Sequence, residues 1–265
     1  MRKTAKILVL ADEPVKAFYE YYNEKTFEGI DLIISCGDLP AKYLTFIADV
    51  FRGEVLYIPG NHDSSYLNKP PKGCVNIDGR IYVWRGLRIL GLGGCYWYKP
   101  GPYQYQESEM NRRYLSLWYS FIKHRGIDIL VTHAPAAGHN DGPDLPHKGF
   151  ETFTAILDKY RPKYYFHGHV HMTYGDYPRL SMYGDTTVVN AYERYIVEVE
   201  LPEDQKSKKH VRRRKFFSTR KSKALCECSH QDDKHQEETH QKEDSKKEHS
   251  KDNHPKDNHS HKVHE

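Results

Sequence analysis

The sequence has no long hydrophobic run, few cysteines and little net charge for its length. No apolar stretch among its 265 residues approaches the roughly 20 residues needed to cross a bilayer, which excludes a membrane-spanning helix. The apolar run 7–10 is too short for a signal peptide and leads directly into Asp12 and Glu13. The five cysteines are odd in number and show no paired spacing, which excludes a disulfide framework. We therefore expect a soluble, cytoplasmic protein.

The net charge of +4 is unevenly distributed along the chain. Residues 1–202 contain 23 basic and 23 acidic residues, whereas residues 203–265 contain 17 basic and 13 acidic residues and 9 of the 17 histidines. A neutral body argues against a domain that binds long nucleic acids, because such binding requires a positive track. The composition therefore predicts one domain over 1–202 and a basic, His-rich tail over 203–265.

The tail lacks the apolar residues that a packed core requires. Ten Lys and Arg without an acid lie in 206–223, and from Ser229 onward the only aliphatic residue is Val263. Such a segment cannot offset the entropy of ordering, so we expect a disordered C-terminal tail. Cys226, Cys228 and His230 are candidate metal ligands, and the basic run is a candidate for weak polyanion binding. A solvated tail without a partner is the alternative that we favour.

The body alternates short apolar runs with segments of helical period. The runs that predict buried strands are 7–10, 32–34, 55–58, 127–131 and 164–166. The segments that predict helices are 15–22, 44–51 and 150–157. A tight turn joins 81–84 to 87–90 and predicts a hairpin, and 187–190 and 195–199 predict closing strands. Alternating strands and helices imply parallel pairing, and therefore a mixed α/β sandwich.

Each of the five apolar runs is followed by side chains that bind metals or phosphate. In chain order these are Asp12, Asp38, Asn61, His62, Asp63, His133, His169 and His171. Ligands of open α/β sheets bind beyond the carboxyl ends of the strands, so these turns are expected to converge. A single such residue is more often part of a turn or a helix cap. Five polar turns in succession favour one shared site.

The residue types indicate a metal site without thiolate ligands. Two carboxylates, one amide and three imidazoles suit Mn²⁺, Fe, Zn²⁺ or Ni²⁺. Six ligands exceed the four that one tetrahedral ion takes, which predicts two divalent ions that share a bridging carboxylate roughly 3.5–4 Å apart. Glycines at positions 37, 60 and 168 allow the tight turns that bring the side chains together.

The order of these motifs resembles that of the calcineurin-like metallophosphoesterases. The resemblance covers about 7–199, looks most like small single-domain phosphodiesterase-type members, and rests on Asp12, Gly37-Asp38, Gly60-Asn61-His62-Asp63, Thr132-His133 and Gly168-His169-Val170-His171. It implies an α/β fold, a four-layer αββα sandwich with two mixed β-sheets. It also implies a phosphoesterase that hydrolyses small phosphate mono- or diesters with metal-activated water.

The resemblance further implies a role for each residue. Asp38 bridges both ions, Asp12 and His171 hold the first ion, and Asn61, His133 and His169 hold the second. His62 protonates the leaving oxygen or stabilises charge, and Asp63 orients it. Asn61 and His62 are also expected to contact the substrate.

The first motif departs from the family pattern. The family has Asp-x-His, but here Asp12 and Glu13 are followed by Pro14, and proline cannot bind a metal. We therefore expect the first ion to be weaker, more exchangeable, or completed by water or another side chain. Glu13 is a candidate substitute, but strand alternation is expected to turn it away from Asp12.

Two functions are compatible with an incomplete first site. The protein is either an enzyme, with substrate and water filling the open positions, or a non-catalytic, mononuclear metal- and phosphate- or nucleotide-binding regulatory module. His62, which a binding site does not need, favours catalysis.

Two further features have alternative interpretations. The aromatic segment 93–98 is either a base-stacking wall or core packing, and His147 is expected to be an ordinary surface residue.

Overall fold

The computed structural model describes residues 4–173, 175 and 177–202; the tail, with Cys226, Cys228 and His230, lies outside these residues. The strands are β1 (Thr4–Ala11), β2 (Leu32–Ser35), β3 (Glu54–Tyr57), β4 (Val75–Asn76), β5 (Arg80–Trp84), β6 (Leu87–Leu92), β7 (Cys95–Tyr96), β8 (Gln104–Tyr105), β9 (Ile129–Thr132), β10 (Tyr164–His167), β11 (Leu180–Tyr183), β12 (Thr186–Asn190) and β13 (Glu193–Glu200). The helices are α1 (Lys16–Tyr19), α2 (Ala41–Val50), η1 (Ser64–Leu67, 3-10), α3 (Glu107–Ser116), α4 (Trp118–His124) and α5 (Glu151–Tyr160).

Two large mixed sheets form the centre of the domain. The first has the order β13-β1-β2-β3-β4, in which β1 to β4 are parallel and β13 is antiparallel to β1. The second has the order β11-β12-β10-β9-β6-β5, in which the four inner strands are parallel and both edge strands are antiparallel. Since parallel strands end at the same edge of a sheet, each sheet gathers the loops that follow its parallel strands.

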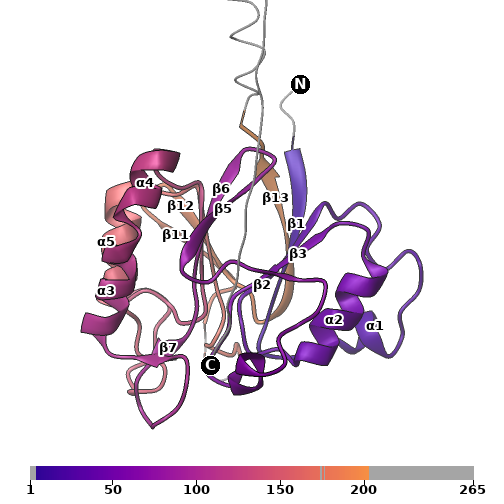
Figure 1. Cartoon of the computed structure of the whole chain (residues 1–265), viewed down its shortest axis with the longest axis horizontal. Helices are drawn as coiled ribbons and strands as arrows, with labels where there is room; N and C mark the ends of the chain where they lie inside the picture. The colour runs from indigo at the N-terminus through magenta and orange to yellow at the C-terminus, as the bar shows by residue number, and fades with distance from the viewer. Residues whose placement is uncertain (1–3, 174, 176, 203–265) are drawn as a thin grey trace, which may run out of the picture. The chain divides into compact units, whose positions relative to one another are not determined.

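Side-chain alternation along the strands divides the hydrophobic core into layers. Ile7 and Val9 of β1 belong to a cluster between the two sheets, whereas Leu8 and Leu10 belong to a cluster under α1 and α2. A third cluster joins the second sheet to α3, α4 and α5. Figure 1 shows these two helical groups on opposite outer faces of the paired sheets. The predicted four-layer αββα sandwich with two mixed sheets is confirmed.

The helix predicted within 15–22 is wrong in its length, because only Lys16–Tyr19 is helical. Beyond this turn, Tyr21 N donates to Lys16 O, and a new turn begins at Asn23. Tyr22 still packs edge-on against Phe46, at 5.7 Å between ring centroids, but does so from outside the helix. The apolar spacing of residues 15–22 therefore reflects tertiary packing rather than a helix that continues to Tyr22.

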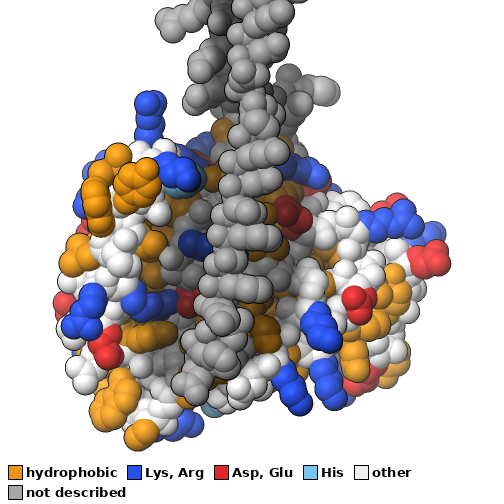
Figure 2. Space-filling model, viewed as in Figure 1, with side chains coloured by type: hydrophobic (Ala, Val, Ile, Leu, Met, Phe, Trp, Pro, Cys, Tyr) orange, Lys and Arg blue, Asp and Glu red, His pale blue; other side chains and the backbone are white. Residues whose placement is uncertain are grey.

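Helices α3 and α4 were not predicted from the sequence. Gln106 and Glu109 form a reciprocal capping box at the start of α3, which is a local signal for a helix start. Beyond it, Tyr114 and Phe121 face the core, while large side chains more than half exposed lie on the opposite side: Leu115, Trp118, Tyr119 and Ile122. Figure 2 shows these hydrophobic groups gathered over α4. None of the described helices has the length and hydrophobicity needed to span a bilayer.

Candidate metal centre

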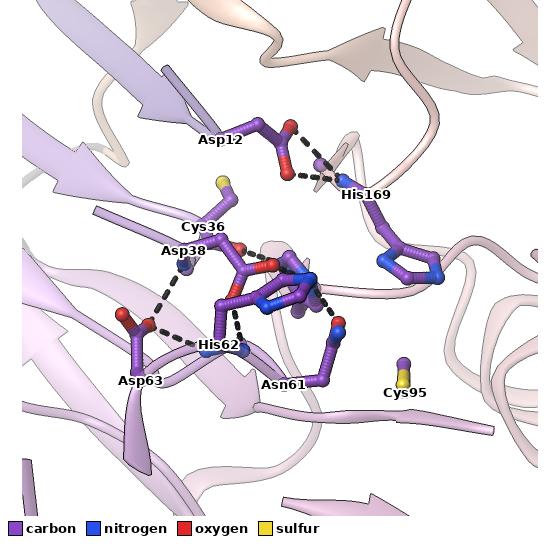
Figure 3. Close-up of polar contacts among 12 residues, drawn as sticks. Asp12, Cys36, Asp38, Asn61, His62, Asp63, Cys95 and His169 are labelled. Atoms are coloured by element: carbon purple, nitrogen blue, oxygen red, sulfur yellow. Dashed lines mark hydrogen bonds and ion pairs between the residues drawn. The ribbon is translucent and has the colours of Figure 1, made fainter. Parts of the chain in front are cut away.

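Polar side chains from both sheets meet beyond the ends of five parallel strands (Figure 3). They are Asp12 after β1, Asp38 after β2, Asn61, His62 and Asp63 after β3, His133 after β9, and His169 and His171 after β10. Ligand atoms of Asp38, His133 and His169 lie within 4.8 Å of one another. The structure thus brings together residues that are up to 131 positions apart in the sequence.

His133 is fully buried and joins the two sheets at this point. Its Nδ1 donates to the carbonyl oxygen of Cys36 at 2.8 Å, while Nε2 lies 3.0 Å from Asn61 Oδ1 and 3.2 Å from Asp38 Oδ2. Because the carbonyl oxygen can only accept, neutral His133 carries its proton on Nδ1, and three lone pairs then converge. A proton or a metal ion at this point satisfies all three, so these residues fit a bound cation. We call Asp38, Asn61, His133 and His169 the His133 cluster.

Asp38 and His133 stabilise each other's charged forms. Burial alone would raise the pKa of Asp38, but the positive charge of His133 and its hydrogen bond outweigh burial and lower that pKa to about 2. Burial alone would lower the pKa of His133, but the negative charge of Asp38 and the hydrogen bond to it raise that pKa to about 9. The site therefore favours a positive charge next to the carboxylate, and a divalent ion supplies such a charge.

Outer contacts orient His169 and Asn61. Nε2 of His169 donates to the carbonyl oxygen of Pro146 at 2.7 Å, so Nδ1 holds the lone pair of the neutral ring. Burial and the charge of His133 lower the pKa of His169 to about 3, which keeps the ring neutral and able to bind metal. Nδ2 of Asn61 donates to the hydroxyl of Tyr98 at 3.2 Å, which directs Oδ1 toward His133. Such contacts hold metal-binding side chains in position.

Three of these residues have an unusual backbone conformation. Asp12, Asp38 and His169 have φ values of 67°, 57° and 69°, in the left-handed region that non-glycine residues seldom adopt. The backbone N–H of His169 donates to both carboxylate oxygens of Asp12, at 2.9 and 3.0 Å, and this contact ties the first sheet to the second. Strain of this kind persists where surrounding contacts hold it, which is common at functional sites.

Gly60 leaves the space that Asp38 occupies. A Cβ at this position would lie 2.2 Å from Asp38 Oδ1 and 2.7 Å from His133 Cε1. The absence of a side chain at position 60 is therefore a packing requirement of the His133 cluster. From the sequence, this glycine was expected only to permit a tight turn.

Asp63 and His62 lie on the turn after β3 and have different surroundings. Oδ2 of Asp63 accepts from the backbone N–H groups of Asp38 and Gly60, at 2.8 Å each, and so holds the two turns together. Burial raises the pKa of Asp63 to about 7, with the charge of Asp38 acting in the same direction. His62 is exposed, and its backbone N–H donates to Asp38 Oδ1 at 2.7 Å. The predicted orientation of His62 by Asp63 stays a prediction.

Asp12, Glu13 and His171 form a more open group, which we call the Asp12 side. Part of Asp12 reaches solvent, yet loss of hydration raises its pKa to about 7. His171 is half-buried, and its ring lies 4.7 Å from the ring of Tyr192, centroid to centroid. Among the described residues, the compact ligand group around His133 does not include Asp12 or His171. The two predicted metal positions are therefore organised to different degrees.

A cavity of about 370 Å³ borders the His133 cluster. It is lined by Pro143, Asp144, His147, Val170 and Tyr177. Nδ1 of His147 lies 2.7 Å from Asp144 Oδ2, and the His147 ring lies 5.2 Å from that of His169. From the sequence, His147 was expected to be an ordinary surface residue, although its Gly-, Pro- and Asp-rich loop is a weak signal for a binding loop.

The aromatic segment 93–98 packs in the core and also reaches the site. Tyr96 packs against Phe150, at 5.4 Å between ring centroids, as core packing requires. Tyr98 instead reaches Asn61. Trp97 is 44% exposed, and its role as a base-stacking wall stays a prediction. Cys36 and Cys95 are free and buried.

The strand-end arrangement corresponds to a known family. The sequence profile of the calcineurin-like phosphoesterases matches residues 6–173, more than half of the chain. The chain belongs to the calcineurin-like phosphoesterase family. A UPF0046 protein of Caenorhabditis elegans is 23% identical over 207 residues, which cover 63% of this chain and 70% of that protein. The crystal structure of TT1561 of Thermus thermophilus, 15% identical, covers 76% of this chain and 100% of its own with a TM-score of 0.55, and this likeness concerns the fold.

Proposed function

We propose that this protein hydrolyses small phosphate mono- or diesters with two divalent ions held at the strand ends. The observation that carries the proposal is the convergence of Asp38 Oδ2, Asn61 Oδ1 and His133 Nε2 on one point. Three acceptor atoms around one buried point suit a bound cation, which is either a proton on His133 or a metal ion. Membership of the calcineurin-like phosphoesterases supports the same activity.

The two ions would share the carboxylate of Asp38. The His133 cluster would hold the second ion with two imidazoles, one amide and this carboxylate. Asp12 and His171 would hold the first ion together with Asp38. Mixed oxygen and nitrogen donors of this kind suit Mn²⁺, Fe or Zn²⁺.

Bound ions would supply positive charge for the phosphoryl oxygens and lower the pKa of the attacking water. The chain's own contribution is placement and proton transfer. The attacking water would lose one proton to solvent, and its oxygen would form a bond to phosphorus while the ester P–O bond breaks on the opposite side. Protonated His62 would donate its proton to the departing ester oxygen. Exposed His62 is suited to this role because it can regain a proton from solvent.

The cavity beside His169 would receive the organic part of the substrate. Its volume of about 370 Å³ is at the small end of the range for ligand pockets, which favours a small phosphoester over a polymer. His147 and Asp144, whose Nδ1 and Oδ2 atoms lie 2.7 Å apart, line this cavity and would contact that part of the substrate.

A panel of phosphomonoesters and phosphodiesters tests the proposal. Purified protein is stripped with a chelator, and hydrolysis is measured before and after Mn²⁺, Fe²⁺ or Zn²⁺ is added. We expect turnover only with added metal. Asp49→Asn, a change of an exposed acid on α2, provides the matched control for variants of the site and should behave as the unmodified protein.

A second candidate function is a mononuclear metal- and nucleotide-binding regulatory module. It is favoured by the contrast between the compact His133 cluster and the open Asp12 side. The same panel separates the two functions. Absence of turnover with every divalent ion, together with nucleotide binding that His169→Ala weakens, would establish the binding module and reject the hydrolase.

A further inference from the structure

Helices α3 and α4 carry two apolar stripes, and only one of them is covered by the core. Tyr114, Leu117 and Phe121 are buried, and the Phe121 ring stacks on that of Tyr160 at 4.1 Å between centroids. The second stripe follows the spacing i, i+3, i+4, i+7, which gathers side chains on one side of a helix. We call it the outer stripe; its members, each more than half exposed, are Leu115, Trp118, Tyr119 and Ile122.

The outer stripe forms one patch rather than four scattered side chains. The rings of Trp118 and Tyr119 meet edge-on at 6.0 Å between centroids. Such rings cover roughly 150–250 Å² each when buried. Because the two are 64% and 63% exposed, they alone leave on the order of 200–300 Å² uncovered. A contiguous apolar patch of a few hundred Å² on a soluble domain marks an interaction site.

The charged residues around the outer stripe are basic. Arg112, Lys123 and Arg125 are exposed, and the segment 110–127 contains no Asp or Glu. Among the described residues, none of these three side chains forms an ion pair. Figure 2 shows Lys and Arg side chains beside the hydrophobic groups over α4. The patch therefore combines apolar area with uncompensated positive charge at its rim.

We propose that the outer stripe docks on the surface of an anionic lipid bilayer. Trp118 and Tyr119 would lie at the level of the headgroups, where rings with one polar edge are favoured. Lys and Arg at the rim would keep their apolar stems on the patch and place their charges among lipid phosphates. The helix would lie in the plane of the interface, as amphipathic helices of peripheral proteins do.

A second copy of the chain fits this patch less well. In a symmetric dimer the same surface is used by both subunits. Since the exposed charges at the rim are Arg112, Lys123 and Arg125, every charged contact across such an interface would join like charges. A bilayer that contains anionic lipid supplies the opposite charge around the same apolar area. Charge complementarity thus favours the lipid surface.

The tail contains a second basic segment that must be separated from the patch in any test. Residues 206–223 include ten Lys and Arg and no acid. Each basic residue near an anionic membrane adds to electrostatic attraction, and stable attachment usually requires two signals. The full chain is therefore expected to be attracted by its tail as well. This attraction is common to all variants of the outer stripe.

Vesicle binding by the full-length chain tests the proposal. The protein is sedimented with vesicles of phosphatidylcholine alone or with added phosphatidylserine, and we expect at least about tenfold tighter binding to the anionic vesicles. Trp118→Gln with Ile122→Gln should weaken that binding at least about tenfold, because apolar area is lost from the patch. Tyr21→Gln with Ile196→Gln, at positions 72% and 54% exposed elsewhere on the domain, should bind as the unmodified protein does.

Tryptophan fluorescence separates docking of the stripe from attraction of the tail. The chain has three tryptophans, of which Trp84 is buried and Trp97 is 44% exposed. In a Trp97→Phe variant, Trp118 is the one tryptophan open to solvent. We expect its emission to shift to shorter wavelength with anionic vesicles and to be quenched by lipids with brominated acyl chains. Adding Trp118→Phe should abolish both effects.

Four results would overturn the proposal. Equal vesicle binding by the stripe variant and the unmodified protein, without a Trp118 shift, would assign the attraction to the tail. Equal binding to neutral and anionic vesicles would remove the role of the basic rim. A dimer in sedimentation velocity that the stripe variant abolishes would assign the patch to a second copy. Absence of binding to either vesicle would leave a protein as the partner. The proposed hydrolase is independent of all four, since no residue assigned to its site lies in α3 or α4.

Discussion

The His133 cluster and the Asp12 side differ in how completely the fold has placed their donor atoms. In the His133 cluster, ligand atoms of Asp38, His133 and His169 lie within 4.8 Å of one another. Contacts with Cys36, Tyr98 and Pro146 hold the side chains of this cluster in place. On the Asp12 side, the carboxylate of Asp12 bonds to a backbone N–H, and Glu13 remains exposed. The fold alone therefore brings the candidate ligands of the His133 cluster close together and leaves the Asp12 side more open.

This difference has a thermodynamic meaning. Residues held in position by other contacts lose little conformational freedom when an ion binds, whereas more exposed side chains lose rotamer entropy, up to about 1.5–2 kcal/mol for a long side chain. The His133 cluster should therefore bind its ion more tightly and exchange it more slowly. Variants in the His133 cluster, on the Asp12 side, or outside both test this expected difference in ion binding.

Asp38→Asn should have the largest effect, since Asp38 belongs to both proposed ion positions. Removing its charge leaves His133 without the partner that stabilises a cation, and we expect both ions to be lost. Loss of metal-derived stabilisation worth several kcal/mol corresponds to a fall in kcat/KM of roughly 10³-fold or more. Elemental analysis and steady-state kinetics measure the two effects. Retention of either ion at full occupancy would show that Asp38 is not shared.

His62→Ala should reduce kcat while metal content stays the same. General acid catalysis typically contributes 10²–10⁴-fold, so a loss of at least about 10²-fold is expected. The same variant is examined for bound manganese. An equal loss of metal and activity would place His62 among the ligands and remove its assigned role.

Gly60→Ala should damage the His133 cluster more than the Asp12 side. Its new methyl group would lie 2.2 Å from Asp38 Oδ1, so the carboxylate must move, and overpacking of this kind costs about 1–3 kcal/mol. Thermal unfolding and Mn²⁺ calorimetry measure the outcome. Gly101→Ala is the control, because there a Cβ would meet only the far end of the Gln104 side chain, Nε2 at 3.2 Å, and no backbone atom. Similar behaviour of the two variants would contradict the packing argument.

Stability of metal-stripped protein should fall as the pH rises from about 6.5 to about 9. The pKa of His133 is about 9 in the fold, above its ordinary 6.5, so charged His133 stabilises the fold fully below pH 6.5 and this contribution is lost as the pH rises to about 9. The pKa of Asp12 is also raised, to about 7, so protonated Asp12 contributes stability that is lost as the pH rises to about 7. Saturating Mn²⁺ replaces the proton, so the Tm difference between loaded and stripped protein should grow over this range. A constant difference would contradict the assignment.

Deletion of residues 203–265 should have the smallest effect. Every residue assigned to the proposed site lies before position 203, so kcat, KM and the number of bound ions are expected to stay within about twofold of the full-length values. A large loss of activity would show that the predicted domain boundary at 202 is misplaced. Parallel assays of the full-length protein and of residues 1–202 measure kcat, KM and the number of bound ions.

Much of the sandwich could be predicted because its signals are local. Buried parallel strands are short runs of aliphatic residues, and 32–34, 55–58 and 164–166 fall on β2, β3 and β10. The hairpin at 81–90 follows from a two-residue turn between apolar runs. α3 and α4 were missed because apolar side chains lie on both of their faces, with Tyr114 inward and Trp118 outward, which blurs the helical period.

The contacts within the site were less predictable. Tyr98 and Pro146 form hydrogen bonds with the candidate ligands Asn61 and His169 from loops whose sequences carry no motif. The expected direction of Glu13 assumed that the strand continues past Asp12, but β1 ends at Ala11 and Asp12 has a left-handed backbone, so that assumption does not hold. Neither kind of feature leaves a periodic pattern in the chain.

The sequence alone determined the strand order along the chain and the chemical types of the donors, because hydrophobic runs and turn residues act over a few neighbours. Only the tertiary structure decided which donors meet. The pairing of two sheets sets the separation of Asp38 and His133, and one contact between Asp12 and His169 links their edges. Distances between residues remote in sequence follow from the packing of whole layers, and no local pattern encodes them.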